Sequence, residues 1–203
     1  MKLFYMPGAC SLAPHIALRE AGLPHELELV DRSKKTKSGD DYLAINPKGA
    51  VPAVRLDNGQ VLTEAAVIQQ YIADKAPDKK LAPAAGTPER YRLQEWLNYI
   101  ASELHKGIGQ LFNPAMPDEY KDAVKKGLAA RQFAYLEKAL AGREYLLGDF
   151  TIADGYAFTV LNWTKLHKID LSAFPNIVAY MQRVAARPAV QAAMSAEGLL
   201  KAA

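Results

Sequence analysis

Cysteine is almost absent from this sequence, since Cys10 is the only one in 203 residues. A single cysteine excludes an intramolecular disulfide framework and is typical of proteins that work in a reducing compartment. The thiol therefore has two interpretations: a small buried apolar side chain or a chemical reagent.

Long hydrophobic runs are also lacking, and no stretch reaches the roughly 18 apolar residues of a membrane span. The apolar residues after Met1 are interrupted by Pro7 and Gly8, and no small-residue cleavage site follows them. A secretory signal peptide is not indicated. We expect a cytoplasmic protein with no membrane partner.

Charge of one sign is not in large excess, because the formal net charge is only +3. A nucleic-acid-binding protein is expected to carry a basic face interleaved with aromatic residues, so we expect no nucleic-acid partner. The one basic cluster, residues 32–37, is either a solvated loop or a local anion site. No group of ligand residues has metal-binding spacing, and we expect no metal.

The first thirty residues predict a strand, a helix and a second strand. Residues 2–6 are apolar, residues 12–20 have helical periodicity, and residues 25–30 alternate as a strand does. This order is a βαβ unit with parallel strands. Cys10 stands at the predicted helix start, where unpaired N–H groups and the helix dipole favour a thiolate.

The next fifty residues predict a helix–strand–strand–helix arrangement. A short helix is expected over 39–44, strands over 51–56 and 60–62, and a helix over 63–75, with Asn58-Gly59 as the hairpin turn. Residues 77–86 lack periodicity and are rich in proline, alanine, glycine and lysine, which indicates a linker.

Beyond the linker the pattern is helical throughout. Helices are expected over about 87–111, 118–141, 151–168, 176–186 and 189–197. Thr151 and Asp154 have the spacing of a capping box. The predicted fold is an α/β domain over residues 1–76, a linker over 77–86 and an all-α domain over 87–203.

Three polar residues of the first helix after the linker share one face. Asn98, Ser102 and His105 are at positions i, i+4 and i+7, which places them within about 60° of one another on an α-helix. Such a stripe lies beside the apolar face and is suited to line a cleft. The other histidines, His15, His25 and His167, are interpreted as structural.

Several motifs in this order resemble the cytosolic glutathione transferases, and in particular their bacterial beta class. They are residues 7–12 around Cys10, 46–53, 62–64, 95–107 and 196–199. The resemblance implies a thioredoxin-like N-terminal domain of βαβ plus ββα, a helical C-terminal domain that contributes the electrophile pocket, and a homodimer. It also implies glutathione as a co-substrate, with no tightly bound cofactor.

The resemblance assigns roles to residues. Cys10 and His105 are the implied catalytic residues, Glu64 the partner of the γ-glutamyl ammonium, and Lys35 the partner of the glycine carboxylate, although Lys34 and Lys37 are close alternatives. Many relatives have serine at position 65, so Ala65 removes a hydrogen bond worth about 0.5–1.5 kcal/mol. The full implied glutathione set is Cys10, Lys35, Val51, Pro52 (as a cis proline), Glu64, Ala65, Asn98, Ser102, Glu103 and His105.

Three functions are compatible with these residues. The first is detoxification, in which the glutathione thiolate is conjugated to small hydrophobic electrophiles. The second is a thiol-disulfide oxidoreductase or peroxidase that works through a Cys10-glutathione mixed disulfide. The third is a non-catalytic ligand carrier. Candidate residues for the electrophile pocket are Leu111, Phe112, Phe158, Trp163 and Leu166.

Overall fold

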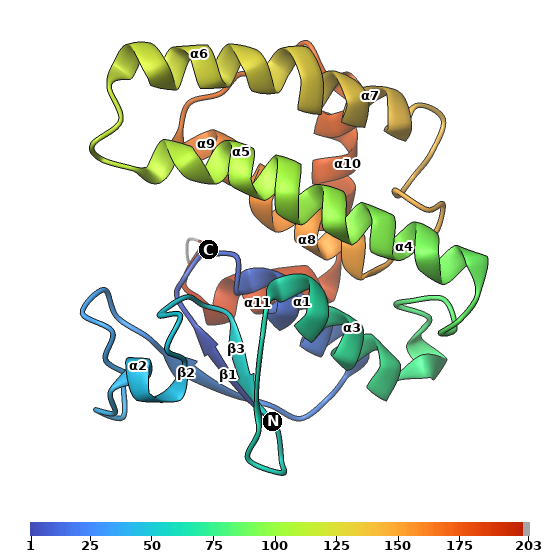
Figure 1. Cartoon of the computed structure of the whole chain (residues 1–203). Coiled ribbons are helices and arrows are strands. Elements are labelled where there is room, and N and C mark those ends of the chain that lie inside the picture. Colours follow the sequence, from blue (N-terminus) through green and yellow to red (C-terminus); the bar gives the residue numbers. More distant parts are fainter. Residues whose placement is uncertain (201–203) are drawn as a thin grey trace. The chain divides into compact units, whose positions relative to one another are not determined.

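The computed structural model describes residues 1–200, which form two compact units (Figure 1). One unit consists of residues 1–82 together with 187–200, and the other of residues 83–186. These units differ from the boundaries expected from the sequence, because the last helix, α11 (Pro188–Ala196), packs against α1 (Leu12–Ala21) of the first unit. Helical periodicity reveals the apolar face of α11, where Val190 and Ala193 are buried, but not the partner of that face.

A four-stranded mixed sheet forms the centre of the first unit. Its order is β2 (Glu26–Leu29), β1 (Lys2–Tyr5), β3 (Ala53–Arg55) and β4 (Val61–Thr63). β1 pairs with β2 in parallel and with β3 antiparallel, and β3 pairs antiparallel with β4. The predicted βαβ plus ββα arrangement, which is the thioredoxin-like fold, is confirmed.

The helices of the first unit hold the sheet and the N-terminal turn in place. α1 has eight of its ten residues buried because α3 (Ala65–Lys75) and α11 both pack against it. It ends at Gly22, whose φ of +65° is a left-handed conformation that glycine adopts without strain. Two short helices, α2 (Tyr42–Ile45) and the 3₁₀ turn η1 (Pro77–Lys79), complete the unit.

The second unit is helical. α8 is buried along its whole length, and the predicted capping box of Thr151 and Asp154 starts it. None of the helices within residues 1–200 is long and apolar enough to cross a membrane. The helices are α4 (Pro88–Tyr99), α5 (Lys106–Gly109), α6 (Asp118–Leu128), α7 (Ala134–Leu140), α8 (Ile152–Leu161), α9 (Trp163–Leu166), α10 (Pro175–Ala185), the 3₁₀ turn η3 (Gln110–Phe112) and the π-helical segments η2 (Ile100–His105) and η4 (Ala129–Phe133).

Three predicted continuous helices are interrupted in the structure. The helix expected over 87–111 contains η2, and the one expected over 118–141 contains η4. The helix expected over 151–168 is divided into α8 and α9 at Asn162. A π-helical turn inserts one residue into the α-helical repeat, and the apolar periodicity on either side of it gives no signal of the insertion.

Candidate active site

Cys10 lies in the turn that connects β1 to α1. The turn includes Gly8, with a φ of +70°, and the helix itself begins only at Leu12, after Ser11 as its N-cap. The Cys10 thiol donates a hydrogen bond to the backbone carbonyl of Val51 at 3.1 Å. The turn therefore brings the single thiol of the chain against the segment that precedes β3.

The environment of Cys10 keeps it protonated. The pKa of the Cys10 thiol is raised to about 11, chiefly by burial and to a smaller extent by the negative charge of Glu64, although the backbone N–H groups of Cys10 and Ser11 act to lower it. The N–H groups at the helix start thus favour the thiolate, as the sequence indicates, but burial outweighs them. Cys10 precedes the first helical residue, and the cost of burying a charge exceeds the effect of the nearby N–H groups.

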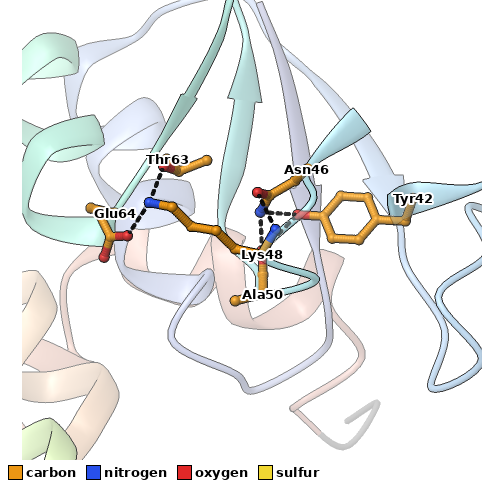
Figure 2. A network of polar contacts seen from close by, with 6 residues as sticks. All are labelled: Tyr42, Asn46, Lys48, Ala50, Thr63 and Glu64. Carbon is orange, nitrogen blue, oxygen red and sulfur yellow. Dashed lines mark hydrogen bonds and ion pairs between the residues drawn. The ribbon is translucent and has the colours of Figure 1, made fainter. Parts of the chain in front are cut away.

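Hydrogen bonds from two buried side chains fix the segment that precedes Val51, as Figure 2 shows. The hydroxyl of Tyr42 and the side-chain amide of Asn46 each donate to the carbonyl of Ala50 at 2.8 Å. Both side chains are almost fully buried, whereas the acceptor residue Ala50 is exposed, so these hydrogen bonds are partly buried. Val51 follows directly, and the Val51–Pro52 peptide bond is cis, as the resemblance implies.

Glu64 lies at the start of α3 with its carboxylate exposed. It is the N-cap residue and has a φ of +71°, a conformation that is uncommon for a side chain of this size and concentrates at functional sites. Its Oε1 accepts from the Lys48 ammonium at 2.7 Å (Figure 2). Ala65 is the first helical residue, so its N–H has no acceptor within the helix.

The basic loop presents three lysines in different settings. Lys35 and Lys37 are exposed, and the backbone N–H of Lys35 donates to Asp31 at 2.9 Å. The Lys34 ammonium is engaged, because it donates to the carbonyl of Gly49 at 2.7 Å. Lys35 is thus better placed than Lys34 to take an external anion.

The C-terminal segment anchors the turn that carries Cys10. Glu197 accepts a hydrogen bond from the backbone N–H of Gly8 at 2.9 Å, and its other oxygen lies 2.9 Å from Nδ1 of His15. Both paired side chains are 0% exposed. The burial and pairing of His15 agree with the structural role expected from the sequence, whereas the only sequence signal of Glu197 is its place in the 196–199 motif.

His105, in the second unit, is held by aromatic residues. Its Nδ1 lies 2.7 Å from the hydroxyl of Tyr156, and its ring packs edge-on against Trp163 with the centroids 5.0 Å apart. Phe112 packs against Trp163 in the same manner at 5.3 Å. Sequence reasoning did not find Tyr156 as a partner of His105, because the two are 51 positions apart.

The predicted polar stripe is altered by η2. Asn98 belongs to α4, but Ser102, Glu103 and His105 lie in the π-helical segment, so the assumed angle of 100° per residue does not hold between them. Asn98 and Ser102 remain exposed, and the Ser102 hydroxyl donates to the Asn98 carbonyl at 2.9 Å. Glu103 is also exposed and accepts from Gln132 at 3.3 Å.

The candidate residues of the electrophile pocket fall into two groups. Leu111, Phe158 and Trp163 are buried, whereas Phe112 is 48% and Leu166 is 68% exposed. The exposed pair has surface free for an apolar ligand, and the buried Trp163 packs against Phe112. Within residues 1–200 there is no group of three or more histidine, cysteine, aspartate or glutamate side chains that could hold a metal ion.

Comparisons with known proteins identify the family of this chain. The models of the glutathione S-transferase N-terminal and C-terminal domains match residues 8–75 and 99–188. Glutathione S-transferase GstA of Escherichia coli O157:H7 is 52% identical over 201 residues, which cover 98% of this chain and 100% of the relative.

Two solved structures are also similar over 98% of this chain, each at 48% identity and with 100% of its own chain covered. One is a sphingomonad glutathione S-transferase complexed with glutathione, with a TM-score of 0.94. The other is the bacterial beta-class glutathione S-transferase of Sphingomonas chungbukensis, with a TM-score of 0.95. The chain therefore belongs to the glutathione S-transferase family, and its resemblance to the bacterial beta class is confirmed.

Proposed function

We propose that this protein conjugates glutathione to small hydrophobic electrophiles. The sulfur of glutathione attacks as a thiolate, a carbon–sulfur bond forms, and the leaving group departs with its electron pair. The observation that carries the proposal is that Cys10 contacts the Val51 carbonyl and lies close enough to Glu64 for its charge to act on the thiol, all within the first unit. Glutathione is the co-substrate, and no tightly bound cofactor is involved.

The first unit binds the tripeptide along its length. The main chain of Val51, before Pro52, pairs with the cysteinyl residue of glutathione as an added strand does. The exposed ammonium of Lys35 takes the glycine carboxylate. Glu64 takes the γ-glutamyl ammonium, and the unpaired N–H of Ala65 donates to the γ-glutamyl carboxylate.

The second unit contributes polar and aromatic groups. Asn98, Ser102 and Glu103 are exposed on one stretch of helix and suit the charged γ-glutamyl end. His105 is held in a fixed orientation by Tyr156 and Trp163, which suits it to donate to the glutathione sulfur. The exposed Phe112 and Leu166 supply apolar surface for the electrophile.

The raised pKa of Cys10 favours conjugation over thiol-disulfide exchange. With a pKa of about 11, the residue is a thiol at neutral pH. The single S–H donor of Cys10 lies on the Val51 carbonyl in this structure. When glutathione pairs with the Val51 main chain, this donor turns to the glutathione sulfur and stabilises its thiolate. Exchange through a mixed disulfide would require Cys10 itself to be a thiolate, which burial disfavours.

Replacement of Cys10 tests the proposal. We expect the wild-type protein to conjugate glutathione to 1-chloro-2,4-dinitrobenzene, and Cys10→Ala to retain conjugation with kcat/KM reduced about tenfold, the effect of losing one donor to an anion. Exchange with a glutathione mixed disulfide should remain slow in both proteins. Tight binding of glutathione without turnover would support the ligand carrier instead.

The protein is expected to act as a homodimer located in the cytoplasm. Sedimentation equilibrium at micromolar concentration tests the first expectation, and a mass equal to a single chain contradicts it. Dimers are the commonest assemblies of soluble proteins, and a two-fold dimer is what the beta-class resemblance implies.

A further inference from the structure

Lys48 is a charged residue close to Glu64, and none of the glutathione contacts proposed above involves it. Its ammonium donates to the Glu64 carboxylate at 2.7 Å and to the Thr63 hydroxyl at 3.0 Å, as Figure 2 shows. The two charged side chains are 58% and 64% exposed, so a bound ligand has access to both. An exposed pair of this kind contributes little to stability, which suggests that its value lies in binding.

The backbone of Lys48 is held firmly. Its N–H donates to the side-chain oxygen of Asn46 at 3.2 Å, and Asn46 is itself buried and bound to the Ala50 carbonyl. The lysine stem therefore starts from a fixed position and reaches across to the end of β4 and the start of α3 (Figure 2). Pre-organisation of this kind lowers the cost of ordering the side chain when a ligand binds.

Three hydrogen-bonding groups around Lys48 and Glu64 are available to a ligand. An ammonium has three donors, and Lys48 uses two of them, on Glu64 and Thr63. Within residues 1–200, the Glu64 Oε2 atom accepts no hydrogen bond, and the N–H of Ala65 has no acceptor in α3. The open positions are a cationic donor, an anionic acceptor and a backbone donor.

We propose that Lys48 is a positioning and specificity-determining residue that binds the α-carboxylate of the γ-glutamyl group, an inference that rests on the proposed function. The zwitterionic head of that group carries an ammonium and a carboxylate. Its ammonium pairs with Glu64 Oε2, and its carboxylate lies between Lys48 and the N–H of Ala65. The four charges then alternate in sign, so each bound group is next to an opposite charge.

The assignment also accounts for Ala65. An alanine at this position offers the ligand carboxylate a backbone N–H but no hydroxyl. A lysine beside it supplies a cationic donor where a serine would supply a neutral one, so the contact with the ligand carboxylate gains a Coulombic attraction. The opposite interpretation is that the Lys48 ammonium pairs with the Glu64 carboxylate and so competes with the ligand ammonium for it. The two interpretations predict opposite changes in affinity when the lysine charge is removed.

The test compares two ligands and four variants by isothermal titration calorimetry. The ligands are glutathione and γ-aminobutyryl-cysteinyl-glycine, which lacks only the α-carboxylate. The variants are Lys48→Met, the charge-retaining Lys48→Arg, and the control Lys79→Met, which removes another exposed lysine of the first unit, paired with Asp78. Lys48→Gln serves as a second neutral variant, and circular dichroism confirms folding.

Lys48→Met should weaken glutathione binding about five- to tenfold, a range between an exposed ion pair and a charge-assisted hydrogen bond. It should change binding of the analogue less than twofold, and Lys48→Arg should recover most of the affinity. In turnover, KM for glutathione should rise while kcat is unchanged, because the contact is made equally in the ground and transition states.

Other outcomes overturn the inference in distinguishable ways. Tighter glutathione binding by Lys48→Met would identify the lysine as a competitor, and unchanged binding would make the ion pair incidental. An equal loss for both ligands would show that the lysine does not recognise the carboxylate. If the wild-type protein itself binds no glutathione, the proposed function fails together with the inference.

Discussion

The surroundings of Cys10 and of His105 differ in how each side chain is controlled. Cys10 is controlled by burial, a backbone carbonyl and a turn that a distant residue, Glu197, anchors. His105 lies on a π-helical segment, and its ring is held by the hydroxyl of Tyr156 and by edge-on packing against Trp163. The comparison shows that a reactive group is tuned here by its neighbours in space more than by the helix that carries it.

Among the variants considered, Glu197→Ala should have the largest effect, because it removes the residue that anchors the turn carrying Cys10. The variant leaves His15 buried without its carboxylate and removes the acceptor of the Gly8 N–H. We expect the free energy of unfolding to fall by about 2–5 kcal/mol, because the buried His15 ring and the Gly8 N–H each lose a hydrogen-bond partner. Urea denaturation measures the change.

The matched control is Glu95→Ala, which removes an exposed glutamate paired with Arg92. It should change the free energy of unfolding by less than about 0.5 kcal/mol. Equal effects of the two variants would contradict the anchoring role of Glu197.

Much of the fold follows from the sequence, because local patterns specify it. The alternation over 25–30, the Asn58-Gly59 turn and the capping box of Thr151 and Asp154 all predicted elements that the structure contains. The packing of α11 against α1 was not predictable from local patterns. Its apolar face is evident in the sequence, but the choice between packing partners is a tertiary property.

The candidate site was predictable only in part. Motif resemblance pointed to Cys10, Val51, Pro52 and Glu64, whereas Lys48 had no local signal because its partner is 16 positions away. The raised pKa of Cys10 was not predictable, because helix position is visible in a sequence and burial is not. The π-helical insertion was hidden because apolar residues continue on both sides of it.

Tyr156→Phe tests whether the tyrosine hydroxyl orients His105. The variant keeps the ring and removes the hydroxyl that lies 2.7 Å from His105. If the hydroxyl positions the imidazole, kcat should fall about three- to tenfold and the pH profile of kcat should shift, with stability reduced by about 1 kcal/mol. Steady-state kinetics from pH 5 to 9 provide the readout.

Tyr99→Phe is the appropriate comparison, because its hydroxyl donates to the Gln132 carbonyl at 3.4 Å and not to the histidine. This variant should leave kcat and its pH profile unchanged. Identical kinetic effects in both variants would mean that loss of the Tyr156 hydroxyl acts through general stability alone.

Lys35→Met should produce the smallest effect, because the residue is exposed and its charge is screened by water. We expect KM for glutathione to rise about two- to fivefold with kcat unchanged. Lys34→Met and Lys37→Met, measured beside it, distinguish the three lysines. A larger rise for Lys37→Met would transfer the glycine carboxylate to that residue.

The central claim is that Cys10 is a protonated hydrogen-bond donor, and its pKa tests this most directly. Because Cys10 is the only cysteine of the chain, the rate of its alkylation by iodoacetamide reports on this residue alone. Measured in the absence of glutathione, the rate should be low at pH 7 and rise with a midpoint at about pH 11. A midpoint below that of a free thiol, about 8.5, would contradict the account and identify Cys10 as a thiolate.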